Sequence, residues 1–173
     1  HMDRQRSEEL ADANAALVNQ VKQRERMEKA LQYERKLAEV TLHSIGEAVL
    51  RTDAHGHVDF MNAVAERLTG WSAGDALGRK LSTVLRILDE DTRACVPDPV
   101  QRCRDSGETV TSSGHEVLQT LGGAEHSVDF VATPVRNADD DVIGAALVVN
   151  DVSDARRRAR QAAREANFDA LTG

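Results

Sequence analysis

The chain has 173 residues, which is enough for one domain with extensions or for two very small domains. Its formal net charge of −7 argues against a general nucleic-acid-binding surface, and its few aromatic residues predict a core that is mostly aliphatic. The only cysteines, Cys95 and Cys103, lack a CxxC spacing and favour a reducing, cytoplasmic compartment over a disulfide framework. No apolar run approaches the ~20 residues of a membrane span. We therefore expect no membrane contact by this chain, although an anchor could still precede it.

The first segment, from Asp3 to about Leu42, contains neither Pro nor Gly and consists of charged and helix-forming residues. Apolar residues recur there at alternating steps of three and four, which is the seam of a coiled coil, although polar residues interrupt it. A helix this polar and this long is rarely stable alone. We predict a parallel homodimeric coiled coil, and the alternative is a single amphipathic helix lying on its own domain. The dimerisation residues that we predict are Leu10, Leu17, Val21 and Leu31.

The middle segment, from about residue 44 to 151, mixes short β-like runs with short helical ones. Asn62 and Gly70 are placed to begin and end one helix, and Pro99 and Gly107 to bound another. We predict an α+β fold in which a five-stranded antiparallel sheet carries short helices on one face. The predicted strands are AVLRTD, VDFMN, HEVLQT, HSVDFVATPVR and VIGAALVVNDV. The predicted helices are AVAERLTGW, SAGDALGRKL, which Gly78 breaks, and PDPVQRCRDSG.

The last segment, SDARRRARQAAREANF, is helical again from Ser153 to Phe168, and Ser153 is a plausible N-cap. Its arginines are flanked by acidic residues, so we interpret them as a solvated helix face. The chain thus reads as helix, mixed α/β domain, helix. This arrangement is typical of a signal relay.

The middle segment resembles a bacterial PAS domain. The residues that carry the resemblance are SIGEAVLRTDAHGHVDFMNAVAERLTGW, then GDALGRKL, and finally VIGAALVVNDVS with its closing Asp151-Val152-Ser153. The resemblance implies the PAS fold, flanked by an N-terminal coiled-coil helix and a C-terminal signalling helix. The domains that we expect are 1–43 (with 1–2 a cloning remnant), 44–153 for the PAS sensor, and 154–173 for the exit helix and the start of the next domain.

The terminal DALTG resembles the D-x-L-T-G motif that opens GGDEF-type diguanylate cyclase domains. This resemblance implies a regulatory module, itself not an enzyme, that controls a C-terminal cyclase making cyclic di-GMP. Because such a cyclase needs two domains facing each other, the module should be a homodimer. Two alternatives stay open: the PAS module of a sensor histidine kinase, and a PAS dimerisation spacer that binds no ligand.

Cofactor signatures known from PAS domains are missing from this sequence. Haem-binding types present an axial His from the helix before the last strands, and that helix here contains Cys103 but no His; the flavin motif Asn-Cys-Arg-Phe-Leu is also missing. His55 and His57 flank Gly56 as a conceivable metal pair, but a polar hairpin turn explains them better. We expect no metal, haem or flavin and no nucleic acid. A small polar metabolite, or no ligand at all, is the expectation.

Strand alternation places Ser127 and Asp129 on the same face of their strand. If this face points toward the helices, Asp129 lies in a ligand pocket and needs a cationic partner, for which Arg51 is a candidate. If it points outward, Asp129 is solvated. Trp71 is the fourth candidate contact, although core packing explains it better.

The junction between the last strand and the exit helix is the predicted relay. A carboxylate at Asp151 can accept N–H groups at the helix start or pair with an arginine one turn later. A simple helix cap is the alternative, but in the family that the chain resembles this motif couples the core to the output helix. The predicted relay residues are Asp151, Ser153, Arg156 and Arg157.

Overall fold

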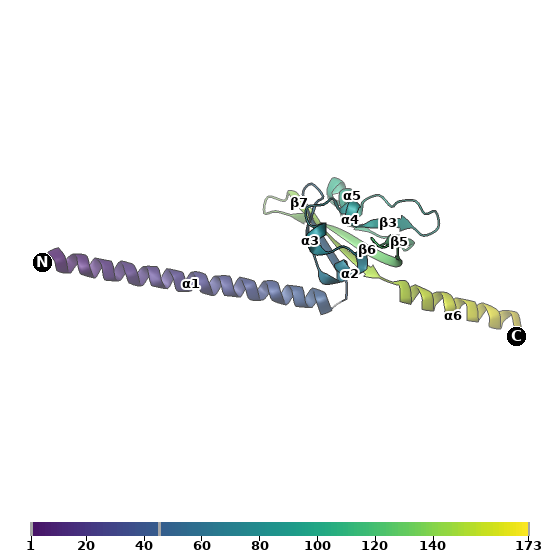
Figure 1. Ribbon diagram of the computed structural model, residues 1–173, viewed down its shortest axis with the longest axis horizontal. Coiled ribbons are helices and arrows are strands. Elements are labelled where there is room, and N and C mark those ends of the chain that lie inside the picture. Colours follow the sequence, from purple (N-terminus) through teal and green to yellow (C-terminus); the bar gives the residue numbers. More distant parts are fainter. Residues whose placement is uncertain (1, 45, 173) are drawn as a thin grey trace. The chain divides into compact units, whose positions relative to one another are not determined.

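A computed structural model describes residues 2–44 and 46–172 of the chain, with side chains described over 2–37 and 46–166. It consists of two compact units, one ending at Thr41 and the other beginning at Leu42, and each is described by itself. Figure 1 labels their helices and strands. Within the described residues, no helix is long and apolar enough to cross a membrane.

The first unit consists of most of a single helix, α1 (Met2–Ser44), as the sequence predicts. Every described side chain between positions 2 and 37 is exposed. The four predicted seam residues are 64%, 57%, 55% and 55% exposed in chain order: Leu10, Leu17, Val21 and Leu31. The four apolar side chains of the predicted seam are therefore exposed on the helix surface. Their pairing with a second copy of the chain stays a prediction.

The second unit is built on one antiparallel sheet of seven strands, two more than predicted. Its order is β2-β1-β7-β6-β5-β3, and β4 pairs with β6 beside this path. The strands are β1 (Ala48–Asp53), β2 (Val58–Met61), β3 (Arg86–Asp89), β4 (Val110–Thr111), β5 (Glu116–Gln119), β6 (Glu125–Arg136) and β7 (Val142–Asp151).

The two additional strands, β3 and β4, are short and form through pairing with longer neighbours. β3 pairs with β5 in the register Ile87↔Leu118, and β4 contributes only Val110 and Thr111 to the edge of β6. Runs of two to four residues carry too little alternation to be recognised in the sequence. Their strand conformation is decided by the partner strand, and for this reason the prediction missed them.

Four short helices precede β5: α2 (Ala63–Thr69), α3 (Ala73–Ala76), α4 (Leu81–Val84) and α5 (Pro99–Ser106). Asn62 caps α2 by accepting the Ala65 N–H at 2.9 Å, and Gly70 ends it in the left-handed conformation, as predicted. The short helix predicted over SAGDALGRKL is broken at Gly78, as predicted. Gly78, at φ +78°, donates to the Val58 carbonyl and separates two single turns, α3 and α4.

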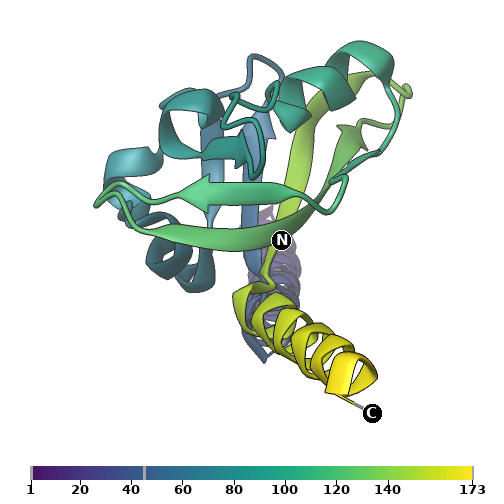
Figure 2. The ribbon, with the colours of Figure 1, turned by 90° about the vertical axis from the view of Figure 1, so that its right-hand side faces the viewer.

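The core lies between the sheet and these helices. From β6 it receives Val128, Phe130 and Ala132, all at most 3% exposed, and from α5 it receives Val100 and Cys103. The alternating residues Ser127, Asp129 and Val131 therefore point away from the helices. Figure 2 views this unit from the end at which the last helix, α6 (Ser153–Thr172), leaves the sheet.

Candidate functional site

The end of β7 and the start of α6 are joined through the carboxylate of Asp151. One oxygen, Oδ1, accepts the N–H of Ser153 at 2.9 Å, and the other, Oδ2, lies 2.9 Å from Nδ1 of His126 on β6. Partial burial acts to raise the pKa of Asp151, but the hydrogen bonds from Ser153 and the nearby His126 outweigh it and lower that pKa. The carboxylate form thus holds the first helical N–H group in place.

Ser153 does not cap α6, contrary to the prediction. It is the first residue of the helix, and its hydroxyl accepts the N–H of Ser127 on β6 at 2.9 Å. The neighbouring Val152 donates its N–H to the Ser127 carbonyl at 2.8 Å. The chain therefore stays bonded to β6 until the turn at which α6 begins, and Asp151 supplies the side-chain oxygen at the helix start.

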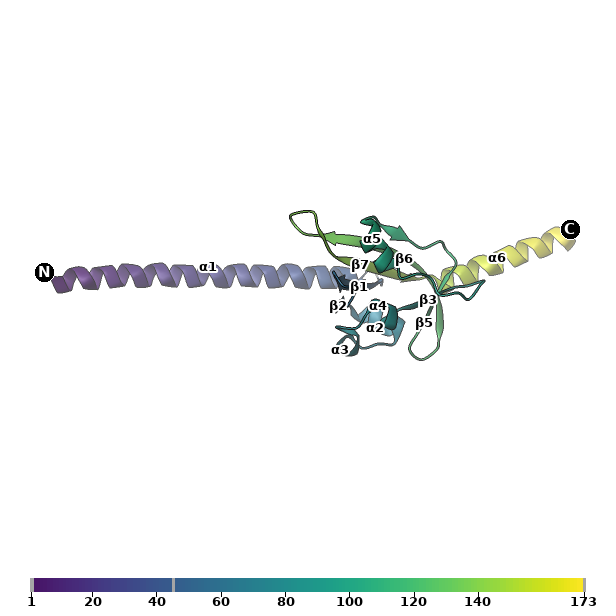
Figure 3. The same ribbon diagram turned by 90° about the horizontal axis from the view of Figure 1, so that it is seen from above.

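Arg156, in the first turn of α6, makes hydrogen bonds to two strands of the sheet. Its side chain is only 18% exposed. Nη2 donates to Asp129 Oδ1 at 2.8 Å and to the Val128 carbonyl at 3.3 Å, and Nη1 donates to the Glu116 carbonyl at 3.4 Å. One guanidinium thus binds both β5 and β6, whose ends lie beside the first turn of α6 in Figure 3.

Glu90, directly after β3, is a second anchor for the same helix. Its carboxylate lies 3.8 Å from Arg156 Nη1 and accepts a hydrogen bond of 2.6 Å from Arg160 Nη2. This pairing helps to raise the pKa of Arg160. The Glu90 backbone is fixed in turn, because its N–H donates to the His115 carbonyl at 2.7 Å. Two consecutive turns of α6 are therefore tied to the sheet by charge.

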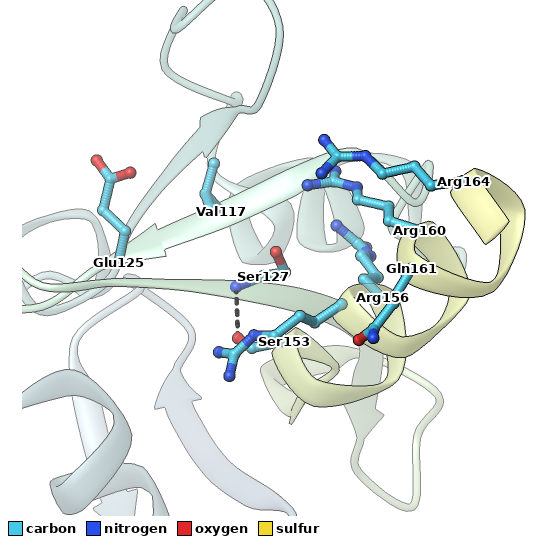
Figure 4. A pocket seen from close by; sticks show the side chains of 9 residues that line it. Val117, Glu125, Ser127, Ser153, Arg156, Arg160, Gln161 and Arg164 are labelled. Carbon is cyan, nitrogen blue, oxygen red and sulfur yellow. Dashed lines mark hydrogen bonds between the residues drawn. The ribbon is translucent and has the colours of Figure 1, made fainter. Parts of the chain in front are cut away.

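A groove of about 520 Å³ runs between α6 and the outer sides of β5 and β6. Figure 4 shows its labelled side chains, with the arginines of α6 on one wall and residues of the two strands on the other. The groove is the candidate functional site, since it lies directly on the strand-to-helix connection. Its lining residues are Val117, Glu125, Ser127, Ser153, Arg156, Arg157, Arg160, Gln161 and Arg164.

Asp129 points away from the helices of the core, which is the second of the two orientations that the sequence left open, so it lines no pocket between the sheet and these helices. It is bound by Arg156, whereas Arg51 pairs with Asp59 at 2.9 Å on the neighbouring strand. Asp129 lines a different pocket, together with Val131 and Asn150. The alternation alone left the orientation of the strand open, and the burial of Val128 and Phe130 decides it. Ser127 lines the groove by α6 instead.

Trp71 packs against the core, which is one of the two interpretations that the sequence left open. It is half-buried against the core, and the guanidinium of Arg79 lies 5.2 Å from its ring centre. The structure does not bring it together with Ser127 in the groove.

Asp151 accepts an N–H group at the start of α6, that of Ser153, which is the first of the two contacts predicted for it. The alternative pairing with Arg156 or Arg157 is not formed, because the second oxygen of Asp151 lies beside His126 while Arg157 lies 3.6 Å from Asp154. The side chains of the D-x-L-T-G motif lie outside the described ones, and residue 173 lies outside the described backbone.

Sequence reasoning missed Glu90, Arg160 and His126. Arg160 could have been found, because it lies one helical turn after Arg156 on the same face. Glu90 and His126 carry no local signal, since each meets its partner only across paired strands. The HGH turn behaves as the polar hairpin expected: the His57 N–H donates to the Asp53 carboxylate at 2.9 Å. Among the side chains described, those of residues 2–37 and 46–166, no group of three metal-ligating ones is present.

A comparison with family models identifies the fold. The model described as PAS fold matches residues 42–157, which is well over half of the chain. The chain belongs to the PAS family, as the sequence motifs predicted.

Two curated relatives match most of this chain. The "Probable diguanylate cyclase DgcE" of Escherichia coli (strain K12) is 36% identical over 157 residues, which cover 90% of this chain and 14% of the relative. The "Cyclic di-GMP phosphodiesterase PdeB" of Shewanella oneidensis is 28% identical over 134 residues, covering 78% of this chain and 15% of the relative. The chain therefore spans about a seventh of each of these relatives.

Solved structures agree on the fold at low sequence identity. The PAS domain of a protein from Colwellia psychrerythraea superposes with a TM-score of 0.55 at 18% identity and covers 72% of this chain and 98% of that one. An RNA-binding Light-Oxygen-Voltage receptor gives a TM-score of 0.55 at 20% identity, over 80% of this chain and 38% of the receptor. At these identities the likeness concerns the fold alone.

Proposed function

We propose that this chain is a regulatory PAS module that transmits its conformational state through α6 to a C-terminal diguanylate cyclase. The observation that carries the proposal is the bonding of Arg156 to both β5 and β6. A change in the relative position of these strands must displace that guanidinium or break its bonds. The helix therefore has a physical reason to respond to the state of the sheet.

The output assignment is supported by the relatives and by the DALTG motif. The relative named as a probable diguanylate cyclase matches 90% of this chain, and the other relative is named as a cyclic di-GMP phosphodiesterase. Both names concern cyclic di-GMP turnover, which favours that signalling route over a histidine kinase output. The phosphodiesterase relative supports a second candidate, in which the output domain degrades cyclic di-GMP.

The proposed module is a homodimer that binds a small signal molecule. The exposed seam of α1, at Leu10, Leu17, Val21 and Leu31, supports the dimer, because apolar side chains at coiled-coil spacing gain stability by burial against a second copy. The binding of a ligand shifts the output only through different affinities for two packings of the helices. The alternative of a ligand-free spacer predicts a dimer that does not respond to any ligand.

The dimer is tested by light scattering at micromolar concentration. We expect twice the monomer mass of 18.9 kDa for the unmodified chain and a shift toward the monomer for Leu17→Asp, which places a charge in the seam. Glu9→Asp, on the same exposed helix, is the control and should leave the mass unchanged. A chain that stays monomeric on concentration contradicts the dimer.

The relay is tested by insertions into α6 of the full-length protein, with cyclic di-GMP production as the measurement. Each inserted residue rotates the following chain by about 100° and moves it by about 1.5 Å. One or two alanines after Ala163 should therefore misalign the paired cyclase domains and lower activity, and seven should approximately restore it. Activity that falls smoothly with insertion length, or does not change, would refute rigid coupling through α6.

A further inference from the structure

The arginines of α6 are arranged along the groove rather than scattered over the helix. Arg156, Arg160 and Arg164 follow one another at intervals of four residues, which stacks them on one helix face, and all three line the groove together with Arg157. Arg158, in contrast, is exposed and does not line it. Figure 4 shows the three stacked side chains extending from the same side of α6.

The acidic groups nearby do not neutralise this set. Glu90 is shared by Arg156 and Arg160, Asp129 is bound by Arg156, and Asp154 lies 3.6 Å from Arg157. The one acidic residue of the lining, Glu125, is paired with Arg93. Arg164 makes no ion pair within the part of the chain that the structure describes. The four arginines of the lining thus face three carboxylates, and Arg164 supplies the remaining positive charge on a protein whose net charge is −7.

We propose that this groove binds a small ligand carrying phosphate groups. A guanidinium presents its N–H donors in a planar fork that matches phosphate oxygens, and three stacked forks can hold more than one phosphate. The lining contains one apolar residue, Val117, and no aromatic residue, so it offers no surface on which a nucleobase could stack. The volume of about 520 Å³ is within the range of small-molecule sites. The ligand class is therefore a compact polyanion of the pyrophosphate type.

The bound anion would compete with protein carboxylates for the same arginines. Phosphate oxygens in the groove can take donors of Arg160 that now bind Glu90, and donors of Arg156 that now bind Asp129. Occupancy would thereby change the bonds that fix the first two turns of α6. The proposed binding of the anion depends only on the groove. Only the proposed effect of the anion on the output domain rests on the proposed function.

Binding is tested on this chain by isothermal titration with sodium pyrophosphate at constant ionic strength adjusted with NaCl. We expect saturable binding of one pyrophosphate per chain. Arg164→Gln and Arg160→Gln should each weaken it roughly tenfold, because each removes a charge-assisted contact. The matched control Arg158→Gln, on the same helix but outside the groove, should bind within about twofold of the unmodified chain.

Three results would overturn the proposal. The first is an absence of saturable binding, and the second is an equal loss in Arg158→Gln, which would indicate general attraction to a basic helix. The third is tighter binding of citrate than of pyrophosphate, which would assign the groove to carboxylates. Arg164→Gln removes no ion pair among the described residues, so helix content measured by circular dichroism should stay unchanged. Because the titration uses no output domain, its failure leaves the proposed relay standing, and a failed relay leaves the binding result standing.

Discussion

The two faces of strand β6 differ in what they contact and in the kind of force involved. The inner face presents Val128, Phe130 and Ala132 to the helices, each at most 3% exposed. The outer face presents Ser127 and Asp129 to α6, where they make hydrogen bonds and an ion pair, and Val131 stays 42% exposed. One strand thus contributes to the core on one side and to the exit helix on the other.

The difference matters because the two kinds of contact have different energetics. Burial of apolar area is non-directional and supplies most of the folding free energy. Ion pairs near the surface contribute little net free energy, but their geometry depends closely on the positions of the partners. We infer that the inner face determines whether the domain folds, and that the outer face determines how α6 is held.

The largest effect is expected from Phe130→Ala on the inner face. Removal of a buried phenyl ring leaves a cavity and should lower the free energy of unfolding by about 3–5 kcal/mol. The matched control is Val131→Ala, at the next residue of the strand, whose side chain is on the outer face. This substitution should change the free energy of unfolding by about 0.5 kcal/mol or less. Urea denaturation followed by circular dichroism measures both. Equal losses in the two variants would contradict the division between the faces.

Glu116 is the charged exception on the inner side and gives the next largest effect. It is 5% exposed, and its carboxylate accepts four hydrogen bonds from the preceding turn: Ser113 N–H and hydroxyl, Gly114 N–H and His115 N–H, all at 2.7–2.9 Å. Glu116→Gln replaces one accepting oxygen by a donor and should lower the free energy of unfolding by about 1–3 kcal/mol. Glu108→Gln, at an exposed position, is the control and should be neutral.

The same carboxylate predicts a dependence of stability on pH. Burial acts to raise the pKa of Glu116, but the hydrogen bonds from residues 113–115 outweigh it and hold that pKa below its ordinary value of 4.5. Because the pKa is lowered in the folded state, the stabilisation is present above pH 4.5 and is lost as the pH falls through the lowered value. Urea midpoints at pH 7, 5, 4 and 3 should fall more steeply for the unmodified chain than for Glu116→Gln. Parallel curves for the two proteins would exclude this role.

The smallest effect on stability is expected at the outer junction, from Asp151→Ala. The carboxylate is 40% exposed and holds the first N–H of α6, so its loss should cost on the order of 1 kcal/mol and shift Tm only slightly. In the full-length protein the same substitution should change cyclic di-GMP production or its response to signal. An outright loss of folding would make Asp151 a structural residue, and unchanged activity and response would remove it from the relay.

Much of the fold was predictable because its signals are local. Alternation marked β1, β6 and β7, and the caps at Asn62 and Gly70 bounded α2. The strands β3 and β4 were missed because they are too short to show a period and depend on β5 and β6 for their hydrogen bonds. The break in the second predicted helix was predictable too, because Gly78 interrupts it by taking a left-handed conformation.

The candidate site was predicted in part, and the limit has a physical cause. Asp151, Ser153 and Arg156 could be singled out, since they follow one another at a strand-to-helix junction. Their partners could not, because Asp129, Glu116 and Glu90 lie 27, 40 and about 70 residues from the arginines that they meet. Such contacts depend on the register in which two strands pair, and the periodicity of the sequence does not determine that register.

By itself, the sequence determined the class of this protein: a PAS domain between two charged helices, with an aliphatic core and a marked junction at Asp151. Hydrophobic periodicity and turn residues are local properties of the chain, so they can be recognised without knowledge of the pairing. The tertiary structure alone decided that Asp129 faces α6 rather than the interior, and that the arginines of α6 line a groove. Both depend on which face of β6 the helices cover, and that choice is made by the simultaneous burial of side chains distant in sequence.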